Sequence, residues 1–154
     1  MTDRSLETVT ILGATGSIGR QTLDVLARNP ERYRVLGLTA GHRWRELAEH
    51  CLTWRPRFAA LADEQAAEAL RNHLREAGSH TQVLAGHAGV AEVAALQEAD
   101  TVVAAIVGAA GLPPTLRAVQ RGAVVALANK ECLVCAGDLF MREVARCNSK
   151  LLPV

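Results

Sequence analysis

Three evenly spaced glycines, at the junction of a short apolar run and a helical pattern, have the spacing of a phosphate-binding turn. In the stretch "TILGATGSIGRQTLDVL" they are Gly13, Gly16 and Gly19. The first glycine can make a tight turn, the second lets a phosphate approach the backbone, and the third lets a helix pack close to a sheet. Thr15 and Ser17 add hydroxyl donors beside the positive end of that helix. The pattern predicts a dinucleotide site, with plain turn glycines as the alternative.

The residues after the next predicted strand indicate which dinucleotide would bind. An NAD site carries an Asp or Glu there for the ribose 2′-hydroxyl, whereas an NADP site carries a cation for the 2′-phosphate. Here the sequence reads "LTAGHRWRE", with His42 and Arg43 directly after Gly41 and no carboxylate at the strand tip. A guanidinium can bind two phosphate oxygens at once. The sequence therefore predicts NADPH, with a solvated basic turn as the alternative.

Two further loops, "IVGAAGLPP" and "ALANKECLVCAG", follow two later apolar runs. In the second loop Asn129, Lys130 and Glu131 place an amide, an ammonium and a carboxylate on consecutive residues. Lys130 could bind a phosphate or polarise a carbonyl, and Glu131 could accept a hydrogen bond from a ribose, an amide or Lys130. The alternative is an ordinary helix start, with Asn129 as the cap and Glu131 favoured by the helix dipole.

These loops must be positioned by elements that alternate along the chain. Apolar runs predict strands at "VTILG" from Val9, "YRVLGLTA" from Tyr33, "FAAL" from Phe58, "TQVLA" from Thr81, "TVVAAI" from Thr101, "AVVALA" from Ala123, and the final "LLPV". Amphipathic stretches predict helices over Ser17–Arg28, Trp44–Trp54, Asp63–Ala77, Gly89–Leu96, Pro113–Arg121 and Leu133–Cys147. Asp63 is a predicted N-cap, and Pro113–Pro114 suits a first helical turn. The alternation predicts one α/β domain over residues 1–154, with a doubly wound, mostly parallel, Rossmann-like sheet.

Composition excludes several other classes of protein. The 154 residues are 49% apolar and 21% charged with a formal net charge of +1, which is typical of a globular protein and argues against nucleic-acid binding. The start "MTDRSLE" lacks the layout of a signal peptide, and the longest apolar run is too short to span a bilayer. We therefore expect a cytoplasmic protein with neither a nucleic-acid nor a membrane partner, and with four reduced cysteines.

Three segments together resemble the 1-deoxy-D-xylulose 5-phosphate reductoisomerase family: "TILGATGSIGRQTLDVLARNPERYRV", "AAIVGAAGLPPTL" and "ALANKECLVCAG". The likeness covers essentially the whole chain. It implies an oxidoreductase and isomerase of the non-mevalonate isoprenoid pathway, which rearranges 1-deoxy-D-xylulose 5-phosphate and reduces the product with NADPH to 2-C-methyl-D-erythritol 4-phosphate. It also implies a divalent metal (Mg²⁺, Mn²⁺ or Co²⁺) that binds the phosphosugar's oxygens.

The resemblance assigns roles to ten residues. Those implied to bind the cofactor pyrophosphate are Thr15, Gly16, Ser17 and Ile18; those around the 2′-phosphate are Gly41, His42 and Arg43; those contacting NADPH elsewhere are Asn129 and Glu131; and Lys130 would bind substrate. In the family a metal-binding Asp-Ser-Glu segment follows "LLPV", with a C-terminal domain beyond it. We therefore expect no catalytic or metal-binding residue within this chain, no turnover by the chain alone, and a homodimer at full length.

The sequence departs from the family pattern at two places. His42-Arg43 stands where many relatives have Lys-Asn, so a positively charged side chain is kept although its exact direction differs. Cys132 stands where relatives usually have Ser, which creates a Cys132-x-x-Cys135 spacing typical of redox or zinc half-sites. The intervening Leu-Val pair instead favours a helix packed on the core, although a thiol near a helix N-terminus can be reactive.

Other functions compete with this interpretation. A short-chain dehydrogenase needs a Tyr-x-x-x-Lys pair, but the only tyrosine is Tyr33 and position 37 is glycine. A semialdehyde or acyl-phosphate reductase needs a nucleophilic cysteine, for which Cys132 and Cys135 are the candidates. A non-catalytic NADP(H) sensor also remains open, because cofactor binding alone does not require the reacting groups.

Overall fold

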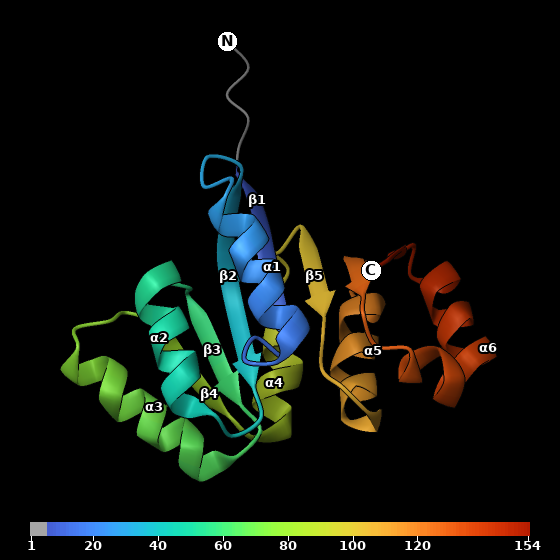
Figure 1. The fold of residues 1–154 in the computed structure, drawn as a ribbon. Helices are drawn as coiled ribbons and strands as arrows, with labels where there is room; N and C mark the ends of the chain where they lie inside the picture. The colour runs from blue at the N-terminus through green and yellow to red at the C-terminus, as the bar shows by residue number, and fades with distance from the viewer. Residues whose placement is uncertain (1–5) are drawn as a thin grey trace.

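The computed structural model describes residues 6–154, in which strands and helices alternate (Figure 1). The strands are β1 (Glu7–Leu12), β2 (Tyr33–Ala40), β3 (Phe58–Leu61), β4 (Gln82–Ala85), β5 (Thr101–Ala104), β6 (Val124–Leu127) and β7 (Lys150–Pro153). The helices are α1 (Ser17–Ala27), α2 (Trp44–Trp54), α3 (Glu64–Glu76), α4 (Gly86–Ala94), α5 (Leu112–Gln120) and α6 (Glu131–Arg146), with a short 3₁₀ turn over Ala109–Gly111. Each predicted strand and helix is present.

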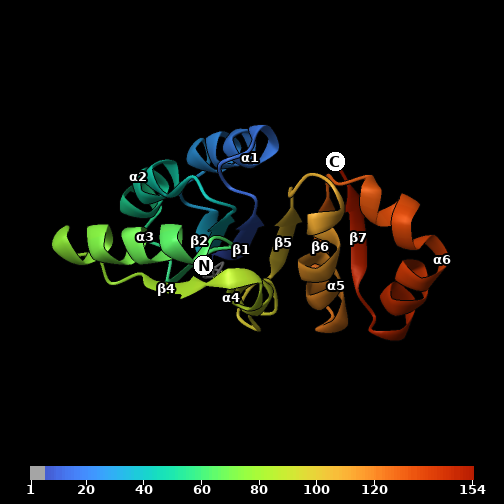
Figure 2. The same ribbon diagram turned by 90° about the horizontal axis from the view of Figure 1, so that it is seen from below.

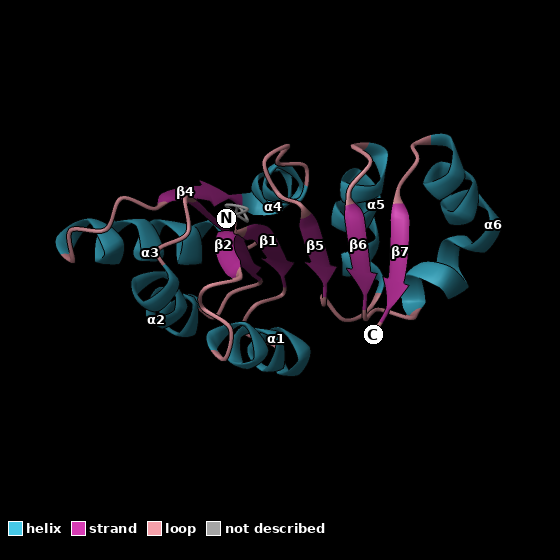
Figure 3. Ribbon diagram, turned by 90° about the horizontal axis from the view of Figure 1, so that it is seen from above, coloured by secondary structure: helices cyan, strands magenta, loops and turns pink. Residues whose placement is uncertain are grey.

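The strands form one parallel sheet in the order β4-β3-β2-β1-β5-β6-β7 (Figure 3). From β1 the chain winds outward through β2 and β3 to β4. Helix α4 then returns it to β5, on the other side of β1, and the chain winds outward again to β7. This arrangement confirms the doubly wound α/β prediction. It also creates a switch point between β1 and β5, where ligands bind in folds of this kind.

Helices cover both faces of the sheet. Figure 2 shows α1 and α2 on one face and α4 and α5 on the other; α3 packs on α2, and α6 packs on α5. The core therefore has two large parts, one centred on Ile11 and Leu38 and the other on Leu12 and Phe140. Burial on both faces explains why the strands are apolar runs without polar alternation.

Local signals set most of the element boundaries. Asp63 caps α3 as predicted, because its Oδ1 accepts a hydrogen bond from the N–H of Ala66 at 2.8 Å. Helix α4 begins at Gly86, three residues before the predicted start at Gly89. Gly86 has a φ of +78°, which turns the chain from β4 directly into the helix.

Helix α6 is less regular than the sequence pattern suggested. It begins at Glu131, two residues before the predicted start, and its backbone leaves helical geometry at Gly137 (φ 11°, ψ −97°). Its outer face is apolar, and Val134 is 82% exposed. Among the helices described in residues 6–154, none has the length and apolar character needed to cross a bilayer.

Candidate functional site

A cleft of about 680 Å³ lies at the carboxyl edge of the sheet, at the switch point between β1 and β5. Its lining comes from five junctions: Gly13, Thr15, Gly16, Ser17, Ile18 and Arg20 after β1; Ala40, Gly41, His42 and Arg43 at β2; Ala62 after β3; His87 and Val90 on α4; and Ala105, Ile106, Val107, Ala110, Pro113 and Pro114 after β5. The cleft thus brings together seven of the ten predicted site residues. Its charged lining is cationic, since the lining residues include arginines but no Asp or Glu.

Gly13 makes the tight turn that its position predicted. Its φ is +82°, and a Cβ built on it would lie 2.8 Å from the carbonyl oxygen of Ala105. The turn is held by the side chain of Thr39, whose Oγ1 accepts a hydrogen bond from the Gly13 N–H at 3.1 Å. Any other residue here would be strained in its backbone and would clash with the loop after β5.

Gly19 and Gly16 differ sharply in the space around them. A Cβ on Gly19 would lie 2.2 Å from the carbonyl oxygen of Gly13, so only glycine allows α1 to pack this closely on the turn. A Cβ on Gly16 would meet only that same oxygen, at an ordinary 3.6 Å. Packing therefore does not require glycine at position 16, whereas close approach of a ligand would require it.

The N-terminus of α1 opens toward the cleft and suits an anion. Gly16 is its N-cap and supplies no side-chain hydrogen bond, and the first turn contains no acidic residue. The early N–H groups of a helix have no partner within the helix, and the helix dipole favours negative charge there. With Thr15 and Ser17 on the same wall, this turn can bind a phosphate or pyrophosphate.

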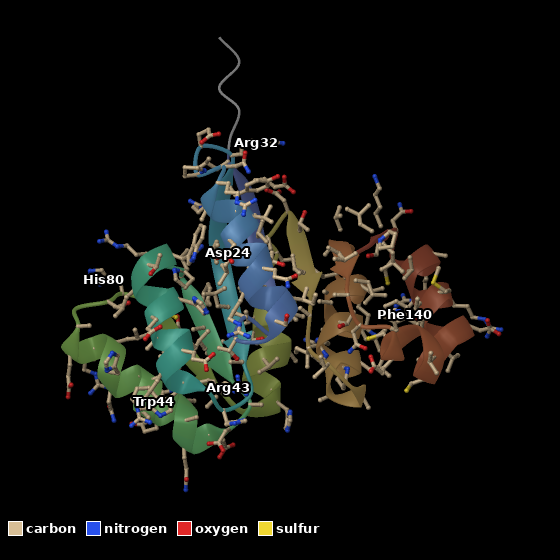
Figure 4. The ribbon with its side chains drawn as sticks, in the orientation of Figure 1. Asp24, Arg32, Arg43, Trp44, His80 and Phe140 are labelled. Atoms are coloured by element: carbon tan, nitrogen blue, oxygen red, sulfur yellow. The ribbon has the colours of Figure 1, made fainter. Side chains whose placement is uncertain are left out.

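Arg43 carries the positive charge at the tip of β2. Figure 4 shows it at the end of the molecule where α1 begins. Its side chain is 56% exposed, and its ion pair with Glu46 is long, at 3.7 Å and one helical turn away. The guanidinium therefore remains accessible to a ligand. His42 also lines the cleft, next to Arg43 in the sequence. The contact of these two residues with a 2′-phosphate stays a prediction.

Asn129 is buried, 4% exposed, and joins the two later loops. Its Nδ2 donates hydrogen bonds to the carbonyl oxygens of Ile106 and Gly108, the latter at 2.9 Å. Its Oδ1 accepts a hydrogen bond from the Glu131 N–H at 2.8 Å, at the start of α6. Asn129 thus accepts a hydrogen bond from the first N–H of α6, but it is not the predicted cap, because the N-cap position of this helix is Lys130. Through its Nδ2 it also fixes the loop after β5 that lines the cleft.

Gly111 makes room for this amide. A Cβ built on Gly111 would lie 2.3 Å from Nδ2 of Asn129 and 2.6 Å from the carbonyl oxygen of Ile106. The second glycine of "IVGAAGLPP", Gly111, and the asparagine of "ALANKECLVCAG" therefore depend on each other. Lys130 and Glu131 are exposed at the start of α6 and are not among the residues that line the cleft. Their contacts with cofactor and substrate stay predictions.

Cys132 does not have the features of a nucleophile. It is fully buried, and burial raises the pKa of its thiol above the ordinary value, outweighing a smaller lowering by a hydrogen bond with Thr115. Cys135 is exposed. The buried thiol counts against an acyl-enzyme mechanism at Cys132.

The described residues do not supply a metal site. Within residues 6–154, no three His, Cys, Asp or Glu side chains come close enough together to hold an ion. The Cys132-x-x-Cys135 spacing therefore has no partners for zinc in this part of the chain. The same holds for a hard divalent cation, which needs several oxygen ligands at one point.

Sequence reasoning missed part of the lining. Ala62, His87 and Val90 lie on the cleft, although only Ala62 directly follows an expected strand and none belongs to a recognised motif. A signal for His87 was present: it directly follows Gly86 at the end of a predicted strand, where side chains reach the ligand edge of the sheet.

The chain matches a family model described as 1-deoxy-D-xylulose 5-phosphate reductoisomerase over residues 9–137. A protein of that name from Cellvibrio japonicus (strain Ueda107) is 54% identical over 148 residues, which are 96% of this chain. The chain spans 37% of the length of that relative.

Two solved structures have the same fold and bind a nicotinamide cofactor. The reductoisomerase of Zymomonas mobilis in complex with NADPH superimposes with a TM-score of 0.92 at 44% identity, covering 97% of this chain and 39% of that one. A DOX-P reductoisomerase in complex with NADPH, fosmidomycin and magnesium gives a TM-score of 0.93 at 40% identity, covering 96% of this chain and 36% of that one.

Proposed function

The chain belongs to the 1-deoxy-D-xylulose 5-phosphate reductoisomerase family, and from this premise we propose that it is the NADPH-binding part of such an enzyme. The complete enzyme would isomerise 1-deoxy-D-xylulose 5-phosphate and reduce it to 2-C-methyl-D-erythritol 4-phosphate. The observation that carries the proposal is the cationic cleft at the switch point, with an uncapped helix N-terminus and Arg43 on its walls. Both solved relatives above are complexes with NADPH.

Each part of the cofactor has a proposed position along the cleft. The pyrophosphate would lie on Thr15–Ile18 at the start of α1, and the 2′-phosphate would meet Gly41, His42 and Arg43. The nicotinamide half would follow the other direction along the sheet edge, past Ala105–Val107. When bound, NADPH supplies the hydride.

The proposal also assigns roles to Asn129, Lys130 and Glu131, the consecutive residues after β6. Asn129 holds the loop at 106–108 by two hydrogen bonds. It would therefore affect the binding of NADPH mainly by positioning that loop. Glu131 would contact the cofactor, and the exposed ammonium of Lys130 would bind the phosphosugar substrate. For these three residues the support is their position at the carboxyl end of β6, together with the resemblance.

We expect NADPH to bind more tightly than NADH, and the Arg43→Asp variant to lose or invert that preference. A charge-assisted contact with a phosphate contributes about 1.5–3 kcal/mol, so NADPH affinity should fall roughly tenfold or more. Calorimetric titration with both dinucleotides measures this. The matched control is Arg45→Asp, which makes the same charge change at a residue that does not line the cleft. Equal affinities in the unaltered chain, or equal effects of the two variants, would contradict the assignment.

The 154-residue chain alone is expected to bind NADPH and to turn over no substrate. Hydride transfer needs the substrate held beside the nicotinamide, and the described residues provide no divalent-metal site to hold it. The measurement is NADPH oxidation with 1-deoxy-D-xylulose 5-phosphate and Mn²⁺, with a full-length relative as the positive control. Robust turnover by the purified chain would show that these residues already form a complete site.

A non-catalytic NADP(H) sensor is the second candidate, favoured by the presence of the cleft in a part of the chain, residues 6–154, that contains no metal site. A turnover assay on a longer chain separates the two, because only the enzyme would consume NADPH. Homodimer formation at full length and a cytoplasmic location are further parts of the proposal. The resemblance to the family supports both.

A further inference from the structure

We infer that His87 recognises the adenine base of the bound dinucleotide, as one wall of a slot that it forms with Ala62 and Val90. The inference rests on the proposed function, in which the cleft binds NADPH. All three residues line that cleft, and none of them belongs to the phosphate-binding turn or to the tip of β2. We refer to them together as the outer slot.

The order of the strands decides which part of the dinucleotide reaches the outer slot. The pyrophosphate lies after β1 and the 2′-phosphate after β2. Beyond β2 the sheet continues to β3 and β4, whose carboxyl ends lead to Ala62 and to His87. The nicotinamide half runs in the opposite direction, toward β5. The base attached to the 2′-phosphorylated ribose is therefore the part nearest to the outer slot.

Ala62 and Val90 give the outer slot the small, apolar walls that suit a purine ring. The backbone of Ala62 runs beside the tip of β2, because its N–H donates to the carbonyl oxygen of Ala40 at 3.1 Å. The following N–H, of Asp63, donates to the carbonyl oxygen of Gly41 at 2.9 Å. Val90 is mostly buried against Ala60 under the sheet. These small apolar surfaces lie next to the predicted ribose position, and their chemistry suits contact with the face of a flat ring.

His87 is placed at the slot by the turn before α4. Gly86 is buried with a φ of +78°, so the chain leaves β4 and starts the helix within one residue. The side chain of His87 is exposed on the cleft and makes no hydrogen bond or ion pair with the residues that the structure describes. Its imidazole is therefore free to stack on a base, and its ring nitrogens are free to bond to one.

The charges around the outer slot favour binding of the base over binding of the 2′-phosphate. Behind the turn, a Cβ on Gly86 would lie 3.3 Å from Oε1 of Glu64, and Asp63 caps α3 at the neighbouring strand end. The carboxylates of Glu64 and Asp63 therefore lie near the outer slot, and their negative charge disfavours the binding of a phosphate there. A neutral base with an exocyclic amino group is compatible with them. The 2′-phosphate already has Arg43 and His42 at the tip of β2.

The test compares His87→Ala with the unaltered chain by calorimetric titration. We expect NADPH, NADH and 2′,5′-ADP to lose affinity by the same factor, about tenfold, because all three contain adenine. Reduced nicotinamide mononucleotide, which lacks adenine, should bind unchanged. His87→Phe should keep most of the affinity, since a phenyl ring also stacks. The control His80→Ala changes a histidine at the opposite end of α3 from the cleft and should have no effect (Figure 4).

The outcomes distinguish this inference from the proposed function. Unchanged affinities in His87→Ala, or a loss confined to NADPH and 2′,5′-ADP, would overturn the adenine role while leaving the cofactor assignment intact. Failure of His87→Phe to restore affinity would overturn recognition by stacking. Failure of the unaltered chain to bind either dinucleotide would overturn the proposed function, and this inference with it.

Discussion

Replacing Gly19 with alanine will destabilise the chain by about 3 kcal/mol and lower its affinity for NADPH. The new Cβ would lie 2.2 Å from the Gly13 carbonyl oxygen and 2.7 Å from the Cα of Ala14. Both neighbours are backbone atoms in the turn after β1, so neither can rotate away as a side chain could. Relief requires α1 to move off the sheet, which would also displace its N-terminus from the cleft.

The matched control is Gly16→Ala, three residues earlier in the same turn. Gly16 has an extended backbone (φ −78°, ψ 173°), and its Cβ would meet nothing closer than 3.6 Å. The free energy of unfolding of Gly16→Ala in urea should stay within about 1 kcal/mol of that of the unaltered chain. The affinity of this variant for NADPH should fall, because the added methyl group occupies the space through which the pyrophosphate would approach the backbone. Gly16→Val should have the same effect on affinity more strongly. Normal stability of Gly19→Ala, or full ligand-induced stabilisation of Gly16→Val, would refute this division of roles.

Asn129→Asp is expected to cost about 2–3 kcal/mol of stability, although the two side chains have nearly the same shape. The amide nitrogen donates to two carbonyl oxygens, those of Ile106 and Gly108. A carboxylate oxygen in its place would face both as an acceptor, in a buried position that disfavours charge. The bond from the Glu131 N–H would survive, since an oxygen remains there. Loss of stability would thus report on the link between the two loops.

The control for that substitution is Asn148→Asp, at the C-terminal end of α6. Asn148 is exposed and has a φ of +57°, a conformation that aspartate also tolerates. The free energy of unfolding of Asn148→Asp in urea should differ from that of the unaltered chain by less than about 0.5 kcal/mol. Thermal and urea unfolding of both variants measure the difference. Equal stabilities would mean that the buried amide does not hold the loops together.

Much of the fold could be predicted because its signals are local. Strands buried on both faces are short apolar runs, and Tyr33–Ala40 and Phe58–Leu61 match the structure at both ends. The roles of Gly13 and Gly19 also followed from their positions, since a strand–turn–helix junction leaves little choice about where glycine is needed. The position of a cation at the tip of β2 could also be predicted, from the residue type of Arg43, whose contact with a phosphate stays a prediction.

The remaining features depend on contacts between distant segments. Asn129 lies 21–23 residues from the carbonyl groups that it binds, and nothing in either loop alone shows that the two meet. The place of His87 depends on which strand lies beyond β3 and on the backbone of Gly86. Such features are set by strand order and by packing, which periodicity does not encode.

The central position of β1 has a consequence for the order in which this protein can assemble during synthesis. The strand pairs on one side with β2, but its other neighbour, β5, is made about 90 residues later; the Thr8 N–H bonds to the carboxylate of Asp100, 92 residues away. At 5–20 residues per second, one edge of β1 waits roughly 5–20 s for its partner. Because the Gly13 turn packs against Ala105, a nascent chain can complete the packing of this turn only after β5 has left the ribosome.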